Sequence, residues 1–227
     1  MAQNTSSPAA TAAVSYRSEM EGHARDYLQR LLEEPFELGT AVRGEEGWYE
    51  VPAESESWGS FRVYVHTGKH GPEVRDDRVL PGLERQMEAL MTDAVPGEAL
   101  CGAYLEFSAG VPARQWYAGE ALATVQQGDT LYADLYLALP EDAAADLPAA
   151  LAALARALEQ GGWYATVTAG TMPAGTLETL RAAEPAEKEL YDAFAARMVW
   201  TVDPAAGMSE AERLAQIEAN WKEASPG

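Results

Sequence analysis

The segment that most constrains the fold is residues 131–139, where two kinds of side chain alternate. The first kind is apolar and occupies every second position: Leu131, Ala133, Leu135, Leu137 and Leu139. The second kind is aromatic or acidic and lies between them: Tyr132, Asp134 and Tyr136. A period of two is typical of a strand with one buried face. The sequence therefore predicts a strand whose leucine face packs on a core and whose tyrosine face points the other way.

Other segments show the same two-faced pattern. Residues 100–108 place Tyr104 and Glu106 opposite an apolar side, and residues 61–66 place Tyr64 on a second face. Shorter strands are predicted over residues 47–51 and 163–167. Two segments between the main strands are expected to pair with each other and to add Trp116 to the aromatic face: 115–117 and 121–125.

Helical spacing separates these strands. Ser18 and Glu21 form a capping box that predicts a helix closed by Pro35, and Pro81 predicts the start of a second helix. The strongest helix carries a leucine stripe and ends at a glycine pair: Leu147, Leu151, Leu154, Leu158, Gly161 and Gly162. Later helices are predicted near 176–183, over 186–199 and around Ile217, while residues 67–79 are expected to form a polar loop.

This order of elements groups the strands in runs, which favours an α+β fold with a mainly antiparallel sheet flanked by amphipathic helices. Residues 1–15 are expected to be a flexible N-terminal lead. Residues 16–203 are expected to form the α+β domain, as one lobe or two, followed by a C-terminal helix within 204–227.

Charge limits the classes of partner. The chain has 36 acidic and 16 basic residues, a formal net charge of −20. Such a field repels phosphate backbones and anionic lipids, so we expect neither direct nucleic-acid binding nor membrane binding. A basic protein partner is favoured, including one that itself binds nucleic acid. The alternative is that the acidity serves solubility alone.

Cellular location follows from what the sequence lacks. Cys101 is the single cysteine, so no intramolecular disulfide forms. No cationic leader and no long apolar run is present. We expect a cytoplasmic protein.

No catalytic motif emerges from the residue spacing. His66 and His70 lie in a glycine-containing loop with no third metal ligand in sight, and Cys101 falls on the apolar side of a strand. The acidic pairs Asp76-Asp77 and Glu141-Asp142 are explained by helix starts and loops. We therefore expect a protein that is not an enzyme and needs no cofactor. The alternative is a small-molecule enzyme or sensor whose site assembles only in three dimensions.

A binding or dimer surface is the better-supported candidate, because tyrosine and tryptophan dominate binding hot spots. The residues proposed for it are Tyr64, Tyr104, Trp116, Tyr132, Asp134 and Tyr136. No Lys or Arg occurs between Arg114 and Arg156, so this aromatic segment is also the most one-sidedly acidic. Acidic and aromatic surface together suits a cationic, partly apolar peptide. The alternative is that a helix or a second subunit covers this face.

The order of elements resembles the YbjN family and the related type III secretion chaperone-like fold. The features that carry the resemblance are the first helix with Tyr27, Leu28, Leu31 and Leu32, the two-faced strands, the helices at 81–92 and 146–160, and the acidity. The resemblance covers about residues 18–200 and implies a homodimeric, non-enzymatic protein that holds other proteins in soluble form. This chain departs from it in its length and in the helices after residue 173.

Overall fold

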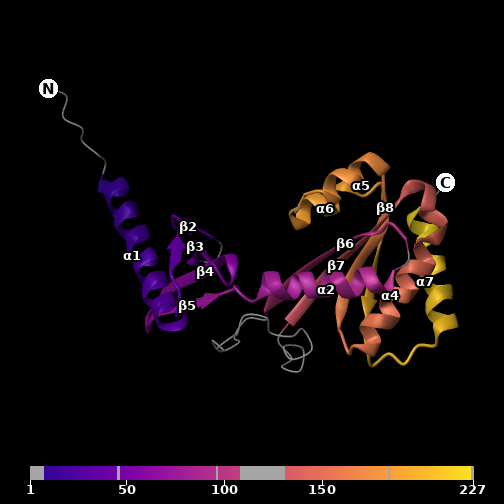
Figure 1. Cartoon of the computed structure of the whole chain (residues 1–227), viewed down its shortest axis with the longest axis horizontal. Coiled ribbons are helices and arrows are strands. Elements are labelled where there is room, and N and C mark those ends of the chain that lie inside the picture. Colours follow the sequence, from indigo (N-terminus) through magenta and orange to yellow (C-terminus); the bar gives the residue numbers. More distant parts are fainter. Residues whose placement is uncertain (1–7, 45–46, 96, 108–130, 184, 226–227) are drawn as a thin grey trace. The chain divides into compact units, whose positions relative to one another are not determined.

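The computed structural model describes residues 8–44, 47–95, 97–107, 131–183 and 185–225. The chain divides into two compact units (Figure 1). The first unit comprises Met1–Gly82 with Pro112–Gly119, and the second comprises Leu83–Val111 with Glu120–Gly227. The range 16–203, predicted to form one lobe or two, spans both units, and the boundary falls inside helix α2 (Leu80–Ala94).

The first unit is a five-stranded antiparallel sheet packed against helix α1 (Pro8–Leu31). The strand order is β1-β3-β4-β5, and β2 also pairs with β3. The strands are β1 (Phe36–Leu38), β2 (Val42–Arg43), β3 (Tyr49–Ser55), β4 (Gly59–Gly68) and β5 (Gly71–Asp76).

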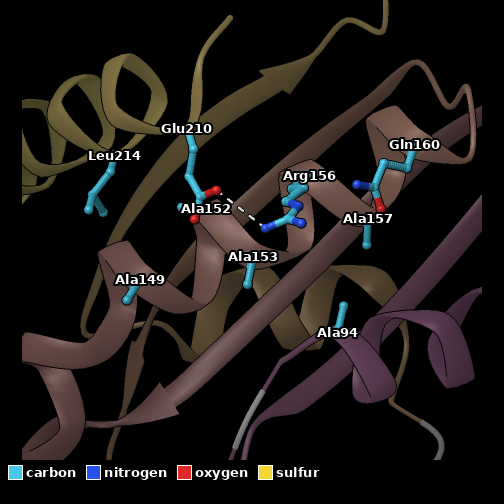
Figure 2. A pocket seen from close by; sticks show the side chains of 9 residues that line it. All are labelled: Ala94, Ala149, Ala152, Ala153, Arg156, Ala157, Gln160, Glu210 and Leu214. Atoms are coloured by element: carbon cyan, nitrogen blue, oxygen red, sulfur yellow. Dashed lines mark hydrogen bonds and ion pairs between the residues drawn. The ribbon is translucent and has the colours of Figure 1, made fainter.

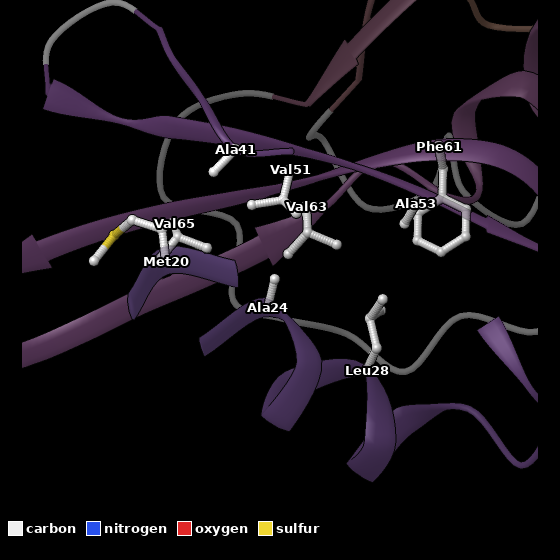
Figure 3. Close-up of a cluster of buried hydrophobic side chains, with 9 residues drawn as sticks. All are labelled: Met20, Ala24, Leu28, Ala41, Val51, Ala53, Phe61, Val63 and Val65. Atoms are coloured by element: carbon white, nitrogen blue, oxygen red, sulfur yellow. The ribbon is translucent and has the colours of Figure 1, made fainter. Parts of the chain in front are cut away.

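The core of this unit follows directly from the two periodicities of helix and strand. Met20, Ala24 and Leu28 are spaced by four residues along α1 and are fully buried. They point toward the inward side chains of β3 and β4, which are Val51, Ala53, Phe61, Val63 and Val65 (Figure 3). The helix face at i, i+4 and the strand face at i, i+2 thus bury each other.

Two predictions for this unit are wrong. Helix α1 begins at Pro8 rather than Ser18, so Ser18 and Glu21 lie inside the helix and cap nothing. The predicted polar loop 67–79 contains strand β5, which pairs with β4 from Val63–Asp76 to Gly68–Gly71. Pro72 lies within β5, which stands at the sheet edge, where a residue without an N–H is tolerated.

A buried ion pair lies where β5 ends. The guanidinium of Arg78 contacts the carboxylate of Asp76, and both side chains are 2% exposed. Asp76 Oδ2 also accepts a hydrogen bond of 2.8 Å from the Tyr27 hydroxyl on α1. The Arg78 guanidinium lies 5.2 Å from the centroid of the Trp58 ring. Helix α1, strand β5 and the β3–β4 turn are thereby joined by one polar cluster.

The second unit contains a four-stranded mixed sheet in the order β6-β7-β8-β9. Its strands are β6 (Leu100–Phe107), β7 (Leu131–Pro140), β8 (Ala165–Met172) and β9 (Ala196–Val202). Pairs β6–β7 and β8–β9 are antiparallel, whereas β7–β8 is parallel. A parallel pair needs a crossover, here supplied by η2 (Glu141–Asp146) and α4 (Leu147–Gln160).

Helices cover the sheet from both sides (Figure 1). Helix α4 packs its leucine stripe under β8, and α7 (Glu210–Ala224) packs against α4 and β9. The ion pair between Arg213 and Glu159 joins these two helices, so the C-terminal helix belongs to the second unit. On the other side lie the short helices α5 (Ala174–Arg181) and α6 (Glu187–Ala193).

The α+β class is confirmed, but one helix prediction is wrong. Residues 186–199 form a short helix and part of a strand rather than one helix, because Phe194 turns extended and ends α6. Met198, Trp200 and Val202 then alternate as buried residues against β8. No helix among the described residues is long and apolar enough to cross a membrane.

Candidate functional site

The most distinctive surface is the face of the second sheet opposite α4. The strand register places its side chains in rows across β6, β7 and β8. Gly102 lies opposite Tyr136, Tyr104 opposite Asp134, and Glu106 opposite Tyr132. The predicted second face of residues 131–139 is therefore one side of a sheet, and its two ends differ in how they are covered.

Helices α5 and α6 cover one end of this face. Leu177, Leu190 and Phe194 pack with Tyr136, Ala138 and Met172 in a buried cluster. Gly102 permits the close approach of α6, since a Cβ there would lie 2.6 Å from Leu190 Cδ1. This end is core, not surface.

Tyr104 and Tyr136 anchor the covered end through their hydroxyl groups. Tyr104 donates 2.7 Å to the Pro185 carbonyl, and Tyr136 donates 2.7 Å to Glu187 Oε1. The two rings meet edge to face, with centroids 5.6 Å apart. Burial, followed by the charge of Glu187, raises the pKa of Tyr104 to about 12. Both phenols thus stay protonated donors at neutral pH and hold the start of α6 to the sheet.

No described element of the second unit covers the other end, and we define it as the open face: Glu106, Tyr132, Asp134, Tyr164 and Thr166. Tyr132 is 60% exposed and Tyr164 is 58% exposed. Tyr164 joins this face because burial alternates from Trp163 to Val167, with Trp163 and Ala165 on the α4 side. Two large exposed aromatic rings therefore lie among carboxylates.

The electrostatics of the open face favour a cation. Burial is the first cause that raises the pKa of Asp134, and repulsion from Glu187 and Glu106 adds to it. These like charges, held close together by the sheet and by α6, disfavour the ionised state of Asp134, and a positive partner relieves the repulsion. An exposed tyrosine ring beside them adds a cation–π surface.

The predicted binding residues are only partly brought together. Tyr104, Tyr132, Asp134 and Tyr136 share one face, as predicted, but Tyr104 and Tyr136 are used to hold α6. Tyr64 lies in the first unit, on a different sheet from the other four. Trp116 lies outside the described residues.

Tyr64 already has partners within its own unit. Its hydroxyl donates 3.0 Å to Asp77 Oδ2, and the Arg75 guanidinium lies 5.5 Å from its ring centroid. Burial beside Asp77 raises the pKa of this phenol to about 12.

Tyr164 and Glu187 were missed by the sequence-based prediction. Alternation of Trp163, Ala165 and Val167 was the signal that would have placed Tyr164 on the polar face. Glu187 had no such signal, because its role depends on how α6 packs.

A second candidate is a pocket in the same unit, with a volume of about 370 Å³ (Figure 2). Its walls come from α4, α7 and the end of α2 and are mostly alanine: Ala94, Ala149, Ala152, Ala153, Arg156, Ala157, Gln160, Glu210 and Leu214. Arg156 Nη1 lies 3.3 Å from Glu210 Oε2 at its rim. The pocket is large enough for a small molecule.

The histidines considered as metal ligands and the cysteine considered as a nucleophile gain no support from the described structure. The His66 ring packs on Trp48 with centroids 5.2 Å apart. Among the described residues, no group of three or more His, Cys, Asp or Glu is placed to hold a metal ion. Burial raises the pKa of the Cys101 thiol to about 11, so the thiolate is scarce at neutral pH.

Comparison with known proteins adds little to this geometry. No family model and no curated protein matches the sequence. A crystal structure of a DUF5037 family protein from Ruminococcus gnavus aligns over 85% of this chain and 96% of its own, with 12% identity and a TM-score of 0.41. A likeness this low carries no conclusion about function, and the resemblance to the YbjN family stays a prediction.

Proposed function

We propose that the protein is a cytoplasmic, non-enzymatic adaptor or chaperone-like protein that binds cationic, partly apolar segments of other proteins on the open face. The observation that carries this proposal is the pairing of Tyr132 and Tyr164, both more than half exposed, with the carboxylates of Glu106 and Asp134. Rigid aromatic rings supply apolar contact area, and the carboxylates select the charge of the partner.

The geometry of a strand-like peptide fits this surface. Side chains on one sheet face are spaced so that a Lys or Arg beside an apolar residue meets a carboxylate and a ring in neighbouring rows. The apolar stem of the cation packs on Tyr132 while its charged end reaches Asp134. Binding of this kind weakens with salt, since exposed charges are screened.

A direct test uses a short fluorescent peptide in which Lys alternates with Leu, and a counterpart with Glu in place of Lys. Fluorescence anisotropy is measured at low and at high salt. We expect the Lys peptide alone to bind, more weakly at high salt. Asp134→Lys and Tyr132→Ala are each expected to weaken binding by at least about tenfold.

Two control variants distinguish binding at the open face from attraction of the peptide by the net negative charge of the protein. Asp142→Lys makes the same charge change in η2, beyond the far end of β7, and Tyr16→Ala removes an exposed tyrosine from the first unit. Both should bind the Lys peptide like the unaltered protein. Equal losses from Asp134→Lys and Asp142→Lys would show that net charge, not the open face, attracts the peptide.

A second candidate function is recognition of a small molecule, and the alanine-lined pocket is the observation that favours it. Arg156 and Gln160 offer donors beside an otherwise small-residue wall. A melting-temperature screen against metabolites tests this function. A ligand that raises the melting temperature of the unaltered protein but not of Ala153→Leu, which fills the pocket, supports it; a flat response in both rejects it.

A further inference from the structure

We propose that strand β9 pairs edge to edge with β9 of a second copy of this chain, joining two second-unit sheets into one continuous sheet. Among the described strands, β9 has β8 as its sole neighbour and stands at the sheet edge. Its register with β8 runs unbroken from Thr171–Ala196 to Ala165–Val202. Regular, exposed edges present backbone groups to another chain.

The two edges of this sheet differ in whether side chains occupy their backbone hydrogen-bonding groups. At the β6 edge, α2 supplies carboxylates: Glu84 Oε1 accepts the Leu105 N–H at 3.1 Å, and Glu88 Oε1 accepts the Ala103 N–H at 3.3 Å. These side chains occupy donors that a foreign strand would need. No hydrogen bond from a described side chain to the backbone of β9 caps its edge in this way. β9 contains no proline, and Val199 is 56% exposed.

The charged residues at the two ends of β9 are complementary to each other and therefore favour a second copy of this chain as the partner strand. Arg197 stands near one end of β9, and Asp203 follows its other end. In an antiparallel self-pairing centred on Trp200, Val199 faces the partner's Thr201 and Arg197 faces the partner's Asp203, twice by symmetry.

The Arg197 guanidinium and the Asp203 carboxylate are already held by contacts within their own chain. The Arg197 guanidinium lies 3.9 Å from the centroid of the Tyr191 ring, and Asp203 Oδ1 accepts the Ala205 N–H at 2.8 Å. Little side-chain freedom is left to lose when the two copies meet. Each guanidinium and each carboxylate still has a hydrogen-bonding position for the partner chain.

The pairing aligns the two open faces. Arg197, Val199 and Thr201 lie on the same side of the sheet as Asp134 and Tyr136. Two copies would therefore present the open face twice on one continuous surface. Because each copy carries a net charge of −20, repulsion opposes association, and added salt should favour it. The salt response is thus opposite to that of the cationic peptide, and either proposal can fail alone.

Charge reversal with mixing tests the register. Light scattering is expected to give twice the 24.4 kDa chain mass for the unaltered protein at moderate salt. Arg197→Asp and Asp203→Arg each place like charges opposite each other twice, and each alone should weaken self-association by at least about tenfold. An equimolar mixture of the two variants restores both opposite-charge pairs, so the dimer mass should return.

The mixture also guards against misfolding, because variants that rescue each other are folded; circular dichroism of each variant alone checks this independently. An unaltered protein that stays monomeric overturns the proposal. So does a dimer that both reversals leave intact, or folded variants whose mixture stays monomeric.

Discussion

Replacement of Asp76 by asparagine should strongly destabilise the first unit while leaving the stability of the second unchanged. Asp76 accepts hydrogen bonds from the Tyr27 hydroxyl, the Arg78 backbone N–H and the Arg78 guanidinium. Asparagine keeps the shape but removes the charge, so the buried guanidinium of Arg78 loses its counter-ion. Arg78 Nε already lacks a hydrogen-bond partner among the described residues, which leaves little to compensate.

The size of the expected loss in free energy of unfolding follows from the burial of the ion pair. Both side chains are 2% exposed, so solvent screening is slight. Breaking a buried ion pair by removing one partner costs about 3–5 kcal/mol. At about 0.05–0.15 kcal/mol per residue, a unit of this size has a free energy of unfolding of about 4–14 kcal/mol, so the loss is a large fraction of it. Replacing both partners, as Asp76→Leu with Arg78→Met, leaves no unpaired charge and should cost less than Asp76→Asn alone.

Amide hydrogen exchange read by mass spectrometry resolves the two units in one sample. In Asp76→Asn, amide protection should fall in β3 and β4 and persist in β7 and β8, while urea denaturation measures the loss in the free energy of unfolding. A loss below about 1 kcal/mol would refute the reasoning. A double variant less stable than Asp76→Asn would do so as well, because it would show that the ion pair is a net gain.

Two further predictions concern the sheet face of the second unit. Gly102→Ala should cost about 1–3 kcal/mol in urea denaturation by pushing Leu190 of α6 from the sheet, whereas Gly175→Ala, with open space around it, should be neutral or stabilising. Because the pKa of Asp134 is raised in the folded state, its ionisation opposes folding as pH rises through that value. Asp134→Asn should therefore have a slightly higher melting temperature than the unaltered protein at pH 7, and the difference should vanish below about pH 3; equal melting temperatures at both pH values would contradict this.

The strand patterns were sufficient to predict which residues share a face. Period two in residues 131–139 placed Tyr132, Asp134 and Tyr136 together because strand geometry alone decides it. The patterns did not reveal which strands are neighbours, so Tyr64 was grouped with residues of another unit. Pairing depends on contacts between distant segments, which local sequence does not encode.

Overlapping periodicities explain the misassigned helix. Leu190, Phe194 and Met198 repeat every four residues, whereas Met198, Trp200 and Val202 repeat every two. Both patterns are valid locally, and the neighbouring strand β8 decides between them. Likewise, only the packing of Leu190 over Gly102 determines that the covered end of the face is core and the open end is surface.

The register of β6 with β7 has a consequence for engineering. Phe107 lies directly opposite Leu131, so the end of β6 and the start of β7 are held one strand spacing apart. Foreign sequence joined to these two residues would begin and end beside Glu106 and Tyr132, so a grafted peptide would be tethered at the open face itself.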